Sequence, residues 1–253
     1  MTTFGAVLAL GIGLVLGLLG GGGSILAVPT FLYVFHVEPK PAIAMSLVVV
    51  GMSALVGFMT HWRQGTINVR IALLFGALAM VGSFGGARLA RFVPASAQLA
   101  LFAAFALSAA VFMLRDSLRP RLAGEVHDAG PLRFSALLGA QAVGVGVLTA
   151  LIGAGGGFVI VPSLVFMANV PVKEAVGSSL LIIAMNAASG VAGYVGQVAF
   201  DWALVGWFTA VAAAGAVMGT RVMTRVPAAR IKQGFAIMIL VLGSYLVIRR
   251  LTH

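Results

Sequence analysis

Two glycine-rich stretches have the residue types and spacing that could bind a ligand. They read LLGGGGSILAVP at 18–29 and LIGAGGGFVIVP at 151–162, each inside an otherwise apolar run. Glycine inside a helix costs about 1 kcal/mol relative to alanine, so each stretch predicts a helix break. A helix that begins after Gly23 or Gly156 would direct its free backbone N–H groups, with their partial positive charge, toward the break. Because such N–H groups bind anions, the two breaks together predict an anion site.

Short polar side chains follow each break and could complete this site. Hydroxyls open the next apolar run after each break, and Ser53 and Asn186 follow about two turns further on. A buried amide can donate hydrogen bonds to an anion, whereas a serine can also bond a carbonyl of its own helix and have no ligand. The candidate substrate-binding residues are Gly22, Gly23, Ser24, Ser46, Ser53, Gly155, Gly156, Gly157, Ser178, Ser179 and Asn186.

Glycine also has a purely structural use in membranes. Small residues let helices pack closely, and Gly82 with Gly86 and Gly215 with Gly219 have the spacing of such contacts. The same explanation stays open for the glycines of the two breaks.

The composition identifies the elements that must position these residues as membrane helices. Of the 253 residues, 61% are hydrophobic and 9% are charged, against about 45–50% and about 25% in soluble domains. Apolar runs long enough to cross a bilayer recur along the chain. The net charge of +10 comes from Lys and Arg clustered between these runs, which is typical of topology-setting loops and not of a nucleic-acid surface.

Several function classes lack the residues that they need. The chain has no Cys, and it has no GxxxxGK[ST] or HExxH motif, so we expect no enzyme, no cofactor and no metal ion. All six acidic residues lie near helix ends or in the central linker, so no carboxylate is available to neutralise a buried cation. The expected partners are therefore a small anionic substrate and the lipid bilayer.

An internal duplication organises the chain. A shift that places Pro29 on Pro162 also aligns Lys40 with Lys173 and Gly86 with Gly219. The expected domains are a first transmembrane repeat at 1–118, a polar linker at 119–133 and a second repeat at 134–253. The expected helices are 4–19, 24–36, 42–60, 67–90 and 96–114, then 134–152, 157–169, 175–196, 202–222 and 228–248. This is an all-α polytopic fold, with a Gly-broken helix pair and about three transmembrane helices in each repeat.

The two repeats can point the same way or be inverted. If each broken pair is re-entrant, the number of crossings per repeat is odd and the second copy is inverted; if it spans once as one broken helix, both copies point the same way. Inversion gathers the linker arginines and the cluster at 221–232 on one side, whereas parallel copies divide the positive charge evenly. Because positive loops are cytoplasmic, the charge favours inversion, with a cytoplasmic linker and both termini outside.

Aromatic and basic residues near the helix ends have simpler expected roles. The aromatic residues Trp62, Tyr194, Trp202 and Trp207 fit an aromatic belt at the membrane interface. Arg88 and Arg221 match across the repeat and could reach the headgroups or line a vestibule. His61 could titrate near neutral pH, or it could be an ordinary interfacial residue.

The doubled G-x-GG-x4-P break, AMSL and GSSL, HWRQGTIN at 61–68 and GSFGGARLA at 82–90 together resemble the TauE/SafE family, also called the 4-toluene sulfonate uptake permease family. The resemblance implies a polytopic transporter of small anions, commonly sulfite, sulfonates or sulfoacetate, in a bacterial inner membrane. One departure is that YVGQVAFD at 194–201 lacks the His and Arg of HWRQGTIN. A duplicated role for His61 or Arg63 is therefore not expected.

We expect a secondary transporter of a small, sulfur-containing anion, for export or uptake. A passive anion channel is the alternative, because the same helix termini would serve a pore. A non-transporting subunit of a membrane complex is the third interpretation.

Overall fold

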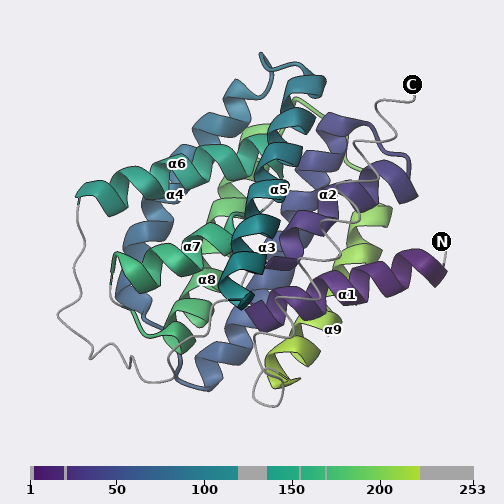
Figure 1. Cartoon of the computed structure of the whole chain (residues 1–253). Helices are drawn as coiled ribbons and strands as arrows, with labels where there is room; N and C mark the ends of the chain where they lie inside the picture. Colours follow the sequence, from purple (N-terminus) through teal and green to yellow (C-terminus); the bar gives the residue numbers. More distant parts are fainter. Residues whose placement is uncertain (1–2, 20–21, 119–135, 154, 169, 223–253) are drawn as a thin grey trace.

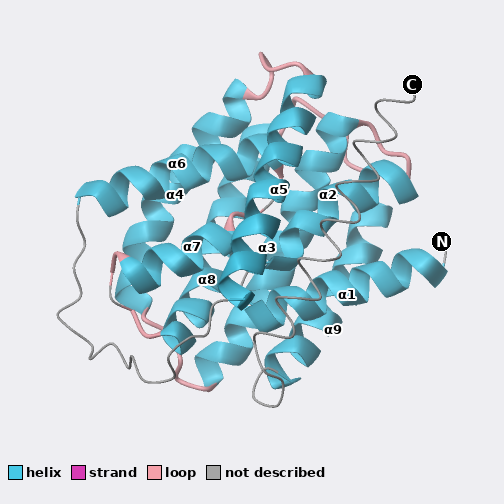
Figure 2. Ribbon diagram, in the orientation of Figure 1, coloured by secondary structure: helices cyan, strands magenta, loops and turns pink. Residues whose placement is uncertain are grey.

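The computed structural model of the chain describes residues 3–19, 22–118, 136–153, 155–168 and 170–222. The described residues form helices joined by short loops, with no strand among them (Figure 2). In chain order they are α1 (Thr3–Leu19), η1 (Gly22–Leu26), α2 (Ala27–Pro29), η2 (Thr30–Val34), α3 (Pro39–Arg63), α4 (Val69–Leu89), α5 (Ala95–Leu118), α6 (Ala136–Ile152), α7 (Gly157–Phe166), α8 (Val172–Tyr194) and α9 (Trp202–Val222).

The helices expected from the apolar runs are confirmed within a few residues wherever the chain is described. Both broken pairs are present, since η1 follows α1 and α7 follows α6 after the glycines. The first short segment differs from expectation, because it begins at Gly22 and continues through α2 into a π-helical turn, η2. The expected helix at 228–248 lies outside the described residues.

Four helices of the described part are long and apolar enough to cross a membrane. They are Pro39–Arg63, Val69–Leu89, Glu174–Tyr194 and Trp202–Arg221. Each exceeds the roughly 20 apolar residues that span a ~30 Å hydrocarbon layer, or matches that length. Shorter apolar helices, including Phe4–Leu18 and Ala136–Ile152, pack around them.

Helices α3 and α8 pack against each other in opposite directions near the centre of the fold (Figure 1). A methyl group added at Gly51 would lie 2.8 Å from Ala187 Cβ, and one added at Gly57 would lie 3.2 Å from Leu180 Cδ1. As the residue number rises along α3, its partner on α8 falls. The two helices occupy equivalent positions in the duplicated sequence, so this equivalent pair is antiparallel.

Glycines of the small-residue pairs lie at helix crossings, as the packing interpretation predicts. An added Cβ at Gly82 of α4 would overlap the carbonyl oxygen of Val143 in α6, and one at Gly215 of α9 would overlap the carbonyl oxygen of Leu10 in α1. The α4–α6 crossing and the α1–α9 crossing therefore use equivalent residues of the two halves. Close approach of this kind is how membrane helices gain dispersion energy without a hydrophobic driving force.

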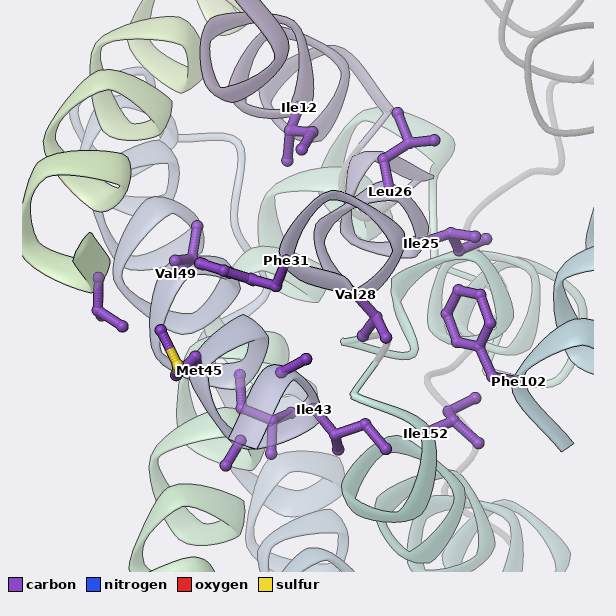
Figure 3. Close-up of a cluster of buried hydrophobic side chains, with 14 of the residues drawn as sticks. Ile12, Ile25, Leu26, Val28, Phe31, Ile43, Met45, Val49, Phe102 and Ile152 are labelled. Atoms are coloured by element: carbon purple, nitrogen blue, oxygen red, sulfur yellow. The ribbon is translucent and has the colours of Figure 1, made fainter. Parts of the chain in front are cut away.

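A buried apolar cluster surrounds the first short segment. Val28 lies near Ile43 and Ile152, and Phe31 extends toward Val49 (Figure 3). Phe31 also contacts Phe208 of α9, with 5.1 Å between the ring centroids. This cluster fixes the segment after the first break between α3, the end of α6 and α9.

Candidate functional site

The second break is an irregular turn in which three glycines have positive φ. The values are 73° at Gly153, 34° at Gly155 and 65° at Gly156. Gly156 is the N-cap of α7, and its carbonyl accepts hydrogen bonds from the N–H groups of Val159 and Ile160. A residue with a side chain adopts this left-handed conformation at a cost of about 1–2 kcal/mol, which explains the glycine at this position.

The two breaks meet each other in the fold. A methyl group at Gly155 would lie 3.1 Å from Ser24 Oγ and 2.7 Å from Val50 Cγ1 of α3. Ser24 belongs to η1, directly after the first run of glycines. Residues that lie far apart in the chain, one from each half, thus form a single buried locus.

The first break has a different geometry. A Cβ at Gly23 would overlap the carbonyl oxygen of Ile12 in α1, and Gly23 does not have a positive φ. The chain after the break therefore folds back closely along α1. At Gly23 the packing interpretation accounts for the glycine, in contrast to Gly156.

Each short segment contains a proline followed by a hydroxyl residue that bonds back to a carbonyl of its own segment. Thr30 Oγ1 donates to the carbonyl of Leu26 at 2.8 Å, and Ser163 Oγ donates to the carbonyl of Val159 at 2.6 Å. These equivalent hydrogen bonds stabilise the turns that contain Pro29 and Pro162.

Ser46 connects α3 to the second break. Its Oγ lies 2.9 Å from the carbonyl oxygen of Gly153 and 2.7 Å from that of Ile43 in its own helix. Val50 and Ser53 follow one and two turns later on the same side of α3. This side of α3 therefore faces the second break from Gly153 to Gly155.

The serines of the equivalent helix α8 make different contacts. Ser179 Oγ donates to the carbonyl of Val176 at 2.8 Å, as expected for a hydroxyl that bonds its own helix. Ser178 Oγ accepts a hydrogen bond of 2.9 Å from the N–H of Asn68, which precedes α4. Ser178 thus holds the α3–α4 connection, and its hydrogen bonds are with Asn68 and not with either break.

Ser53 and Asn186 occupy equivalent positions, and their side chains are buried and without hydrogen-bond partners. Asn186 is 0% exposed, and neither its Nδ2 nor its Oδ1 has a partner; Ser53 is 1% exposed, and its Oγ has none. Buried polar atoms are usually satisfied, because an unsatisfied group costs about 1–3 kcal/mol. Donors left open in this way are available to a bound anion.

Thr149 is a further candidate that the sequence interpretation did not include. Its Oγ1 is buried without a partner, and a methyl group at Gly156 would lie 2.6 Å from it. The equivalent residue of the first half is Leu16, so the duplication gave no signal for this position. A hydroxyl residue one helical turn before a glycine break is the local sequence pattern that could have identified Thr149.

The described residues place no charged side chain in the buried interior. Their buried polar residues are Ser, Thr, Asn, Gln and His, without Lys, Arg, Asp or Glu. Arg88 is exposed at the end of α4, with its guanidinium 5.3 Å from the centre of the Phe84 ring. This arrangement agrees with an arginine that reaches toward the membrane surface.

The expectation of an interfacial role for Tyr194 is wrong. Trp62 and Trp202 are exposed as a belt requires, but Tyr194 is only 1% exposed. Its hydroxyl donates to the carbonyl of Ala150 at 2.9 Å. The small residues Gly190 and Gly193 let α8 approach α6 and α4 closely enough to enclose the ring.

His61 is buried at the end of α3 and holds the following turn. Its Nδ1 lies 3.0 Å from Thr66 Oγ1, and its Nε2 has no partner. A methyl group at Gly177 of α8 would overlap the carbonyl oxygen of Thr66. His61 thus belongs to the contact between the α3–α4 turn and the start of α8.

Comparisons with known proteins agree with this membrane fold. The family described as "Sulfite exporter TauE/SafE" matches residues 5–246. A probable membrane transporter protein of Xylella fastidiosa (strain Temecula1) is 31% identical over 241 residues, covering 94% of this chain and 92% of the relative. The probable membrane transporter protein YdhB of Bacillus subtilis is 29% identical over 218 residues, covering 85% and 88%. No solved structure matches the chain significantly.

Proposed function

The chain belongs to the TauE/SafE family of membrane transporters, and from this premise we propose that it is a secondary transporter of a small anion. The anion is sulfur-containing, such as sulfite, a sulfonate or sulfoacetate, and the protein works in a bacterial inner membrane. The site is built from both glycine breaks, with donors from Ser24, Ser53, Thr149 and Asn186.

The contact between the breaks is the observation that carries this proposal. Gly155 lies against Ser24, so one ligand can contact backbone of both halves. Irregular backbone at membrane depth survives only where protein or a water-filled cavity surrounds it. Transporters built from repeats place their substrate at such breaks, where helix N-termini point to anionic groups. The absence of buried Asp and Glu among the described residues favours an anion over a cation.

We further propose that the repeats are inverted, with domains at 1–118 and 134–253 and a linker at 119–133. Two observations support this topology. The equivalent helices α3 and α8 run antiparallel, and the α1–α9 crossing repeats the α4–α6 crossing with equivalent glycines. In this arrangement each broken pair is re-entrant.

Counterflow in proteoliposomes tests the transporter proposal. Vesicles loaded with unlabelled sulfite should accumulate labelled sulfite transiently, and the rate should saturate with concentration. Ser53→Ala removes a buried hydroxyl that has no partner and should slow counterflow. The control Ser108→Ala removes an exposed hydroxyl that donates to the carbonyl of Phe105 and should leave the rate unchanged.

Two outcomes would contradict the proposal. Ohmic anion currents without saturation would indicate a channel. Inactivity of the purified protein toward every sulfur anion, together with activity in the presence of a second membrane protein, would indicate a subunit of a complex.

A further inference from the structure

Asn186 is the buried side chain whose hydrogen-bonding capacity is least satisfied in the described part of the fold. Two of its atoms, Nδ2 and Oδ1, have no partner, whereas Ser53 and Thr149 each leave one atom unpaired. The amide nitrogen offers two donors and the amide oxygen offers an acceptor. Asn186 therefore has both unpaired hydrogen-bond donors and an unpaired acceptor.

Contacts of the neighbouring residues place Asn186 beside the proposed site. Val50 of α3 faces Gly155 of the second break, and the next residue, Gly51, faces Ala187, which follows Asn186. One turn further along α8, a methyl group at Gly190 would lie 3.1 Å from Leu47 Cδ1 and 3.9 Å from Ala150 Cβ. This turn of α8 therefore packs on the part of α3 that faces the second break and on the end of α6 that leads into it.

The backbone around Asn186 is itself satisfied, which leaves the amide as the open group. Ser83 Oγ of α4 donates to the Asn186 carbonyl at 2.9 Å. Three residues later, Ser189 Oγ donates to the carbonyl of Met80 at 2.7 Å. These hydrogen bonds fix α8 against α4 at Asn186 and about one turn later.

We propose that Asn186 makes the site selective for anions that carry a hydrogen-bond donor in addition to their acceptor oxygens. This inference rests on the proposed anion site. A sulfonate without an O–H or N–H group only accepts hydrogen bonds, so it can pair with Nδ2 and leaves Oδ1 unpaired in the buried interior. An anion with a hydroxyl or amino group pairs with both atoms. The equivalent residue of the first half is Ser53, so Asn186 also makes the two halves of the site chemically unequal.

Two sulfonates of similar size isolate this effect. 2-Hydroxyethanesulfonate and propane-1-sulfonate carry the same single charge and differ by a hydroxyl in place of a methyl group. Calorimetry on the purified wild-type protein should give a dissociation constant about three- to tenfold lower for the hydroxylated sulfonate, the ratio expected for one net hydrogen bond. Because both sulfonates stay monoanionic over a wide pH range, protonation does not confound the comparison.

Variants at 186 assign the preference to the amide. Asn186→Leu is similar in shape and removes both polar atoms, so the ratio of the two dissociation constants should fall to about one. Asn186→Ala serves the same purpose if the leucine variant does not fold. Ser189→Ala, on the same helix but bonded to Met80, should keep the wild-type ratio.

The possible failures are distinguishable. If both sulfonates bind the wild-type protein with equal affinity, or if the preference survives in Asn186→Leu and Asn186→Ala, the selectivity proposal is overturned while the anion site stands. If neither sulfonate binds and no other sulfur anion does, the proposed function itself fails and this inference fails with it.

Discussion

Gly156→Ala is the substitution that tests most directly why the second break contains glycine. Gly156 has φ 65° and ψ 0°, and alanine in this left-handed region costs about 1–2 kcal/mol. The new methyl group would also lie 2.6 Å from Thr149 Oγ1 and 2.9 Å from Val145 Cγ1. Overpacking of this kind costs typically about 1–3 kcal/mol. The two terms together predict a loss of about 2–5 kcal/mol in the free energy of unfolding.

Alanine substitutions at two other glycines measure the backbone cost and the packing cost separately. Gly65 has φ 68°, and nothing lies within 4 Å of an added Cβ, so Gly65→Ala should show only the backbone cost of about 1–2 kcal/mol. Gly82 lies in the regular helix α4, where a Cβ would overlap the Val143 carbonyl. Gly82→Ala should therefore show only the packing cost of about 1–3 kcal/mol.

The assay combines stability with affinity. Thermal unfolding of the ligand-free protein in detergent should rank Gly156→Ala below Gly65→Ala, which has the same backbone cost and no packing cost. Calorimetry with sulfite on the folded fraction should show weaker binding for Gly156→Ala alone, because the methyl group obstructs approach to the N–H groups of the break. If Gly156→Ala binds sulfite as tightly as the two controls, the glycine is a packing and turn residue and the anion-site reasoning is refuted.

Two further predictions follow from topology and charge. With no native Cys in the chain, an impermeant maleimide applied to intact cells should label Ala199→Cys before α9 and leave Gln64→Cys before α4 unlabelled. Labelling of both positions, or of Gln64→Cys alone, would contradict the proposed inversion and orientation. The described interior has no buried cation, so the dianion sulfate should stabilise the protein only at a concentration at least about tenfold above that of the monoanion methanesulfonate, a difference of about 1.4 kcal/mol in binding free energy. Equal potency of the two anions would indicate a cationic site.

The helices and their breaks could be predicted from local properties of the sequence. Hydropathy and glycine content act on each segment separately, so they locate helix ends such as Leu19 and Ile152 without knowledge of their neighbours. The duplication added the equivalence of Ser53 with Asn186, and the spacing of Gly82 and Gly86 indicated a helix crossing. These features depend on residues that are close in the chain or repeated along it.

Contacts between distant segments were decided only by the tertiary structure. The sequence does not indicate that Gly155 meets Ser24, that Ser46 bonds the Gly153 carbonyl, or that Tyr194 is enclosed against Ala150. Each depends on the direction and depth at which α3, α6 and α8 pack, and packing is a property of pairs of surfaces and not of one segment. For the same reason Gly23 and Gly156, which look alike in the sequence, differ in the fold. Gly23 allows close packing on α1, whereas Gly156 allows a left-handed turn beside Thr149.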